Sequence, residues 1–161
     1  MATHDLHSHA RPEEARVTHV ALDLTVDFAT RTLRGTSRLD FEAEPGATEL
    51  VLDSRRLTIH RVTDDRGVPL AFELGHDDAV LGSRLAVALP RNGRVTIEYT
   101  TAPDAEALQW LDPEQTAGGE HPFLFTQGHA IQTRSWIPLQ DSPGVRVTSE
   151  VPKRPSGLEI G

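Results

Sequence analysis

Apolar residues occupy every second position over a long stretch near the start of the chain. They alternate from Val20 to Phe28, with small or polar residues between them, and again from Leu33 to Phe41 after a short polar turn at 29–31. Side chains of a β-strand point alternately to opposite faces, so each segment is predicted to be a strand with one buried and one exposed face. Two such segments around a tight turn predict an antiparallel hairpin.

The same pattern continues as short apolar segments up to Thr101. They are separated by turn sequences rich in Gly, Pro, Asp and Asn, at 44–46, 64–67, 75–78 and 90–93. No window in this region has helical periodicity, so the fold class is predicted to be all-β, an antiparallel sheet or sandwich. The β domain is expected at 17–148, between a flexible N-terminus at 1–16 and an irregular tail at 149–161.

The pattern changes after Pro103. Asp104 is placed to cap a single helical turn over 105–108. Residues 108–123 contain several Pro and Gly residues, which predict an irregular connection, and long irregular connections in compact domains are often functional. The apolar residues of this connection favour an ordered loop packed on the sheet.

Composition narrows the function classes. The chain has 161 residues, 37% hydrophobic, and carries a net charge of −8 with no cysteine. This size and composition fit one globular domain, and the negative charge disfavours nucleic acid and anionic lipid as partners. No apolar segment has the length of a secretory signal or a membrane helix, so we expect a cytoplasmic location.

No self-sufficient catalytic motif is present in the sequence, neither His-Glu-x-x-His nor a phosphate-binding glycine loop. A histidine trio, His4, His7 and His9, has side chains that can bind a divalent metal, although an exposed terminus explains it as well. Glu120 and His121 have the residue types of a base with an orienting carboxylate, or of an ordinary surface loop. The residues alone decide neither case.

The segment 123–143 differs from the predicted strands that precede it. It brings Gln127, His129 and Arg134 close together in sequence, with Gly128 permitting close approach of another group. The composition leaves two alternatives open, a polar sheet edge that contacts water and a surface that binds a ligand.

Several sequence motifs resemble the N-terminal domain of the leukotriene A(4) hydrolase type of zinc aminopeptidase. The resemblance spans about Thr18 to Thr148, and its most specific part is Gln-Trp-Leu-x-Pro-Glu-Gln-Thr in the segment 109–116. Further matching stretches are Phe-Leu-Phe-Thr-Gln at 123–127, Arg-Ser-Trp-Ile-Pro-Leu-Gln-Asp-Ser-Pro-Gly-Val at 134–145, Val-Asp-Phe at 26–28, Thr-Leu-Arg-Gly-Thr at 32–36 and Leu-Val-Leu-Asp at 50–53.

This resemblance implies a saddle-like antiparallel β domain that packs on a separate catalytic domain. It implies zinc in that other domain and no cofactor in this chain, with a peptide substrate shared between the two. Gln127 and His129 are then the substrate-binding residues, and no residue of the chain is catalytic. The family pattern is Gln-x-Gln, so His129 replaces its second glutamine, and a protonated histidine repels a peptide ammonium.

After Thr148 the resemblance ends, and the sequence suggests a truncated or frameshifted fragment. We therefore expect a noncatalytic N-terminal domain that forms one wall of an aminopeptidase cleft. The alternative is a stand-alone peptide- or protein-binding β module, which presents Gln127, His129 and Arg134 to a partner.

Overall fold

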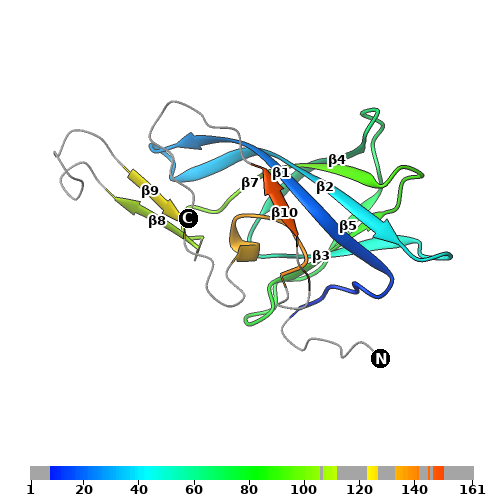
Figure 1. Cartoon of the computed structure of the whole chain (residues 1–161). Helices are drawn as coiled ribbons and strands as arrows, with labels where there is room; N and C mark the ends of the chain where they lie inside the picture. Colours follow the sequence, from blue (N-terminus) through cyan, green and yellow to red (C-terminus); the bar gives the residue numbers. More distant parts are fainter. Residues whose placement is uncertain are drawn as a thin grey trace.

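A computed structural model describes residues 8–105, 107–111, 123–126, 133–141, 145 and 147–150 (Figure 1). Strands dominate the described chain, which confirms the predicted all-β class. In chain order the elements are β1 (Ala15–Asp27), β2 (Thr32–Ala43), β3 (Glu49–Ser54), β4 (Thr58–Asp64), β5 (Phe72–Leu74), β6 (Ser83–Ala88), β7 (Arg94–Thr100), β8 (Leu108–Leu111), β9 (Phe123–Thr126), the 3-10 helix η2 (Thr133–Ser135) and β10 (Thr148–Glu150).

The larger sheet contains five strands in the order β10-β1-β2-β7-β4 (Figure 1). Its centre is the hairpin expected from the alternation, in which β1 and β2 pair antiparallel from Ala15 opposite Ala43 to Asp27 opposite Thr32. The short strand β10 pairs with β1 in the parallel direction, so the sheet is mixed rather than purely antiparallel. The alternating pattern therefore identified the central strands, while the added parallel strand is a feature of the fold alone.

A smaller sheet of three strands, in the order β3-β6-β5, packs against the larger one. Leu50, Leu52 and Val87 from this sheet share one core with Val20, Leu39 and Ile97 of the larger sheet, and all six side chains are buried. Strand β3 is buried on both faces, because Val51 and Asp53, which point away from this core, are also shielded from solvent. Burial of apolar surface between the sheets is the main stabilising term for such a sandwich.

The N-terminal boundary differs from the expected one at residue 17. Strand β1 begins at Ala15, and the side chains of Ser8 and Ala10 are buried before it. Ser8 and His9 donate hydrogen bonds to the carboxylate of Asp53, which attaches this segment to β3. Residues 8–16 thus pack on the domain instead of forming a flexible terminus, while residues 1–7 and 151–161 lie outside the described part.

The region after Pro103 also differs from the expectation. The backbone N–H of Leu108 donates to the carbonyl oxygen of Ala105 at 3.1 Å, which closes a single turn. Leu108 is also the first residue of β8, which pairs antiparallel with β9 in a separate two-stranded sheet. Leu108 and Leu124 are buried, so the strand pair gains apolar contacts that an isolated helical turn would not. The expected irregular connection was therefore wrong for 108–111, which form β8, and 112–122 lies outside the described residues.

Gly35 allows β1 and β2 to approach closely. A Cβ atom on this residue would lie 2.0 Å from the carbonyl oxygen of Asp23 and 2.9 Å from the Cα of Leu24. Backbone atoms cannot move aside as the end of a flexible side chain can. Only glycine therefore fits at this point of the hairpin.

We expect Gly35→Ala to lower the free energy of unfolding by about 3 kcal/mol, because the new methyl group collides with backbone. Gly67→Ala is the matched control. Gly67 has a φ of 82° but no atom within 4 Å of a Cβ, so it should lose only about 1 kcal/mol from backbone strain. Urea unfolding monitored by circular dichroism measures both, and equal losses would contradict the close contact at Gly35.

Candidate functional site

The segment singled out by the sequence begins with β9. This strand ends at Thr126, opposite Leu108 of β8, and η2 begins at Thr133. Gln127 and His129 follow β9 directly in the chain, and both lie outside the described residues, as do His121, Glu120 and Gln132. The structure thus describes what precedes and follows the proposed substrate-binding residues.

The strand pair β8–β9 is attached to the rest of the domain by aromatic packing. Trp110 of β8 meets Phe28, at the turn after β1, edge to face with ring centroids 5.6 Å apart and an interplanar angle of 89°. Such a geometry is favourable for aromatic rings beyond the area they bury. Leu124 of β9 is fully buried as well. The strand that leads into Gln127 is therefore held against the end of the β1–β2 hairpin.

A buried ion pair holds the chain on the other side of the segment. The guanidinium of Arg134 is fully buried, and its Nη1 lies 3.6 Å from Oδ1 of Asp53, whose side chain is also fully buried. The same Nη1 donates to the carbonyl oxygen of Leu81 at 2.7 Å, and Nη2 donates to the carbonyl oxygen of Asp141 at 3.1 Å. Arg134 thereby joins β3, the turn before β6 and the chain after η2.

Asp53 and Asp141 share the positive charge of Arg134. Asp53 also accepts hydrogen bonds from the Ser8 hydroxyl, from the His9 backbone at 2.6 Å and from the Asp141 backbone at 3.0 Å. Arg134 Nε lies 3.2 Å from Oδ2 of Asp141. Burial raises the pKa of Asp141, while the charge and hydrogen bonds of Arg134 oppose that rise. We call Asp53, Arg134 and Asp141 the buried charge cluster.

Arg134 is therefore unavailable to a partner, which corrects its place in the binding-module alternative. Its side chain has no exposed surface, and its polar atoms face other parts of the same domain.

The sequence contained a usable signal for Asp53. Leu50, Val51 and Leu52 are apolar in succession, which indicates a strand buried on both faces, and a carboxylate on such a strand needs a buried partner.

The described residues do not form a metal centre around the histidine trio. His4 and His7 lie outside them, and the backbone of His9 is bound to Asp53 while its ring Nε2 lies 3.4 Å from the carbonyl oxygen of Gly82. No group of three His, Cys, Asp or Glu side chains within the described ranges is arranged to hold a metal ion. The described side chains therefore do not form a zinc site, and we derive no chemical step through zinc.

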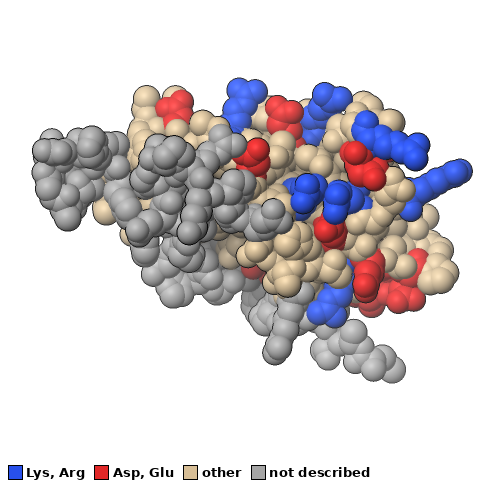
Figure 2. Space-filling model, turned by 45° about the horizontal axis from the view of Figure 1, so that its top comes forward, with Lys and Arg blue, Asp and Glu red and all other residues tan. Residues whose placement is uncertain are grey.

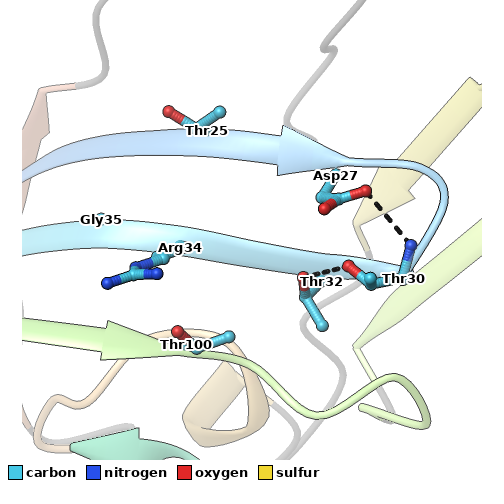
Figure 3. Close-up of a pocket in the computed structure, with 7 residues that line it drawn as sticks. All are labelled: Thr25, Asp27, Thr30, Thr32, Arg34, Gly35 and Thr100. Atoms are coloured by element: carbon cyan, nitrogen blue, oxygen red, sulfur yellow. Dashed lines mark hydrogen bonds between the residues drawn. The ribbon is translucent and has the colours of Figure 1, made fainter. Parts of the chain in front are cut away.

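A polar recess of about 600 Å³ lies beside the turn that joins β1 and β2, at the closed end of the hairpin (Figure 3). Its lining is formed by Thr25, Asp27, Thr30, Thr32, Arg34, Gly35 and Thr100. The carboxylate of Asp27 accepts hydrogen bonds from the backbone of Ala29 at 2.9 Å and of Thr30 at 3.1 Å. Bonds from Thr30, with a smaller one from Ala29, lower the pKa of Asp27. The carboxylate thus stabilises its own turn, and the described lining residues include no histidine or lysine to act as a base beside a nucleophile.

Charged side chains of both signs are interspersed on the face of the molecule seen in Figure 2. Two cross-strand ion pairs of the large sheet join Arg94 to Asp40, with Nε and Oδ1 2.6 Å apart, and Arg34 to Glu98 at 3.9 Å. The hydrogen bond and charge of Asp40 raise the pKa of Arg94. The outer face of this sheet is therefore a mixed polar surface.

These features define the class of protein. The two-sheet sandwich, with a strand pair leading into a glutamine-containing segment, is the fold of an aminopeptidase N-terminal domain. The chain belongs to the Peptidase M1 N-terminal domain family, which matches residues 15–152. The predicted resemblance is confirmed by this match.

Named relatives place the chain more closely within that family. It is 38% identical to leukotriene A-4 hydrolase of Xenopus laevis over 151 residues, which cover 89% of this chain and 25% of the relative. It is 37% identical to leucine aminopeptidase 2 of Yarrowia lipolytica, covering 92% of this chain and 24% of the relative. The chain thus spans about a quarter of the length of these curated relatives.

Solved structures give the same placement. The structure of yeast LTA4 hydrolase in complex with bestatin superposes with a TM-score of 0.84 at 30% identity, covering 92% of this chain and 24% of that one. The M1 zinc metallopeptidase from Deinococcus radiodurans shares the fold, with a TM-score of 0.63 at 18% identity over 86% of this chain and 32% of that one. The fold is therefore that of the M1 N-terminal domain.

We expect Arg134→Met to lower the free energy of unfolding by about 3–5 kcal/mol, because it leaves the buried carboxylate of Asp53 without its cation. Arg94→Met is the matched control. It breaks an ion pair whose side chains are 43% and 29% exposed, and should cost less than about 1 kcal/mol. In the Arg134→Met background, Asp53→Asn should cost less than in the original chain. Urea unfolding measures the original chain, the three single variants and the double variant, and additive losses would contradict coupling between Arg134 and Asp53.

The pH dependence of stability tests the turn of Asp27. The pKa of Asp27 lies below its ordinary value of 3.8 in the folded chain, so its ionised form stabilises the fold at pH values above 3.8. This contribution is lost as the pH falls through the lowered folded pKa. In Asp27→Asn the amide oxygen still accepts the two backbone bonds without a charge. The stability advantage of the original chain over this variant should therefore shrink from about pH 6 to about pH 3. An advantage that stays constant over this range would argue against the pKa shift.

Proposed function

We propose that the chain is the noncatalytic N-terminal domain of a zinc aminopeptidase of the leukotriene A(4) hydrolase kind, and that it forms one wall of the peptide cleft. The observation that carries this proposal is the family match over residues 15–152, combined with relatives of which the chain spans about a quarter. In this proposal the zinc and the hydrolytic groups belong to a separate catalytic domain.

The described strands and the 3-10 helix on either side of Gln127 and His129 are held in place by buried contacts, which favours a positioned binding segment between them. β9 is held by Leu124 and, through β8, by Trp110 on Phe28, while η2 is held by the buried Arg134. A chain that starts and ends at such fixed points has fewer conformations to lose when it binds a ligand. We infer that this frame positions the segment containing Gln127 and His129 for a peptide.

Gln127 and His129 have suitable chemistry for the N-terminus of a peptide. An amide oxygen accepts a hydrogen bond from an ammonium without carrying a charge, and a neutral imidazole nitrogen can accept another. Protonation of His129 would replace this acceptor by a cation that repels the ammonium. The proposal therefore includes a substrate affinity that weakens at acidic pH, where an imidazole becomes protonated.

A cytoplasmic location is part of the proposal and rests on the sequence prediction. Within the described residues no helix has the length and apolar character needed to cross a membrane. Cell fractionation with an antibody against the chain tests the location directly.

Joining the chain to the catalytic domain of an M1 relative tests the proposed function. The 161-residue chain incubated with zinc should not hydrolyse leucine p-nitroanilide, whereas the joined protein should. In the joined protein, Gln127→Ala should raise KM about tenfold through loss of a hydrogen bond to a charged group. His129→Gln should lower KM at pH 6 more than at pH 8, because glutamine stays neutral.

Thr25→Ala, on the outer face of the sheet, is the control variant and should leave KM unchanged. Zinc-dependent turnover by the chain alone would contradict the noncatalytic assignment. Unchanged KM in both Gln127→Ala and His129→Gln would remove these residues from the substrate site while leaving the domain assignment intact.

A further inference from the structure

Strand β5 is an open sheet edge. It lies at the end of the order β3-β6-β5 and pairs only with β6 among the described strands. All three of its residues are exposed, in contrast to β6, where four of the six residues are buried. An open edge presents backbone donors and acceptors to any extended chain that approaches it.

The pattern of hydrogen bonds shows which backbone groups of β5 face outward. Gly75 donates to Arg84 at 2.8 Å, and Ala88 donates to Ala71 at 2.9 Å. Hydrogen-bonded pairs alternate along an antiparallel ladder, so Glu73, midway between Ala71 and Gly75, directs its N–H and C=O to β6. The N–H and C=O groups of Phe72 and Leu74 therefore point away from β6, toward the open edge.

The side chains of this edge are unusually apolar for an exposed surface. Phe72 is 39% exposed and Leu74 41%. They are two of the four exposed large hydrophobic residues of the described chain; the others are Val68 and Val80, in the segments before and after β5. Exposed apolar side chains along a sheet edge favour an interaction surface.

Glu73 gives this edge a charge preference. Its side chain is exposed, points to the opposite face from Phe72 and Leu74, and makes no ion pair within the described residues. In an added antiparallel strand, the residue opposite Glu73 occupies a position without backbone hydrogen bonds to it, where the two side chains approach most closely. A lysine or arginine at that position would be favourable, and an acidic residue unfavourable.

The same charge disfavours a second copy of this chain as the occupant. Two β5 strands paired about their centres would place Glu73 opposite Glu73 of the other copy, at the closest side-chain distance of the ladder. Like charges in this arrangement destabilise the pairing. An edge residue of this kind is a common means of preventing self-association of sheets.

We propose that the open edge of β5 binds an extended segment of another protein, in which a lysine or arginine is flanked on both sides by apolar residues. The segment adds a fourth strand antiparallel to β5. Its backbone pairs with Phe72 and Leu74, its apolar residues pack on their side chains, and its basic residue lies opposite Glu73. This interaction does not depend on the proposed aminopeptidase role.

A peptide titration followed by nuclear magnetic resonance tests the proposal on the full 161-residue chain. The probe is the blocked peptide Thr-Val-Lys-Val-Thr, and the matched control is Thr-Val-Glu-Val-Thr. The lysine peptide should shift the backbone amide signals of Phe72 and Leu74, with an affinity about fivefold higher than that of the glutamate peptide. Glu73→Lys should reverse this preference without altering the fold, because the residue is exposed.

A third peptide, with methyl groups on the backbone nitrogens of both valines, separates strand addition from simple charge attraction. It keeps the lysine but cannot donate to β5, so its binding should be lost. Absence of shifts at Phe72 and Leu74, equal affinity for the lysine and glutamate peptides, or undiminished binding of the methylated peptide would each overturn the proposal. A concentration-dependent dimer that Leu74→Lys abolishes would overturn it in favour of a second copy.

Discussion

The buried pair of Asp53 and Arg134 is the constraint on which the arrangement of this domain depends. Moving either charge from water into a protein interior costs several kcal/mol, and the mutual attraction offsets this only when the remaining hydrogen bonds are also made. Here they are made by parts of the chain that are far apart in sequence. Ser8 and His9 donate to Asp53, and Arg134 donates to the carbonyl oxygen of Leu81. The cost of leaving one charge unpaired therefore holds these segments on one side of β3.

The buried ion pair also fixes one end of the segment that contains the candidate site residues. Arg134 follows the segment that contains Gln127 and His129, and Leu124 precedes it, and both side chains are fully buried. The two ends of the segment are thus specified by different forces, apolar burial on one side and a buried ion pair on the other. The proposed cleft wall would need such fixed ends, because a binding group held loosely loses entropy when its ligand arrives.

The sequence predicts those strands that are specified by the alternation of apolar and polar residues within a single segment. Alternation from Val20 to Phe28 and from Leu33 to Phe41 specified the central hairpin, because one apolar face suffices to mark a strand. The short strands β8 and β9 escaped prediction, since four residues carry little periodicity and their pairing joins segments separated by 112–122. Arg134 was misplaced on a binding surface for a related reason: its partner Asp53 is distant in sequence, and residue type alone does not reveal burial. Composition singled out Gln127 and His129 without deciding between a polar edge and a binding surface, and only the resemblance supplied their expected role as substrate-binding residues.

The outer edges of the two sheets, at β4 and β5, differ in how their backbone groups are protected from pairing with another strand. At β4 the outer edge of the large sheet is interrupted by a bulge between Ile59 and Arg61, and it is partly covered by the chain after the turn, where Leu70 donates to Val62 at 2.8 Å. Bulges, charged residues and covering loops are the usual protections of a sheet edge. At β5 the pairing with β6 has no register shift, Phe72 and Leu74 are partly exposed, no other described strand pairs with the edge, and a single carboxylate provides the protection. Glu73 repels a second copy of β5 but attracts a strand that carries a basic residue. The β5 edge therefore discriminates between partners, whereas the β4 edge is protected against pairing in general.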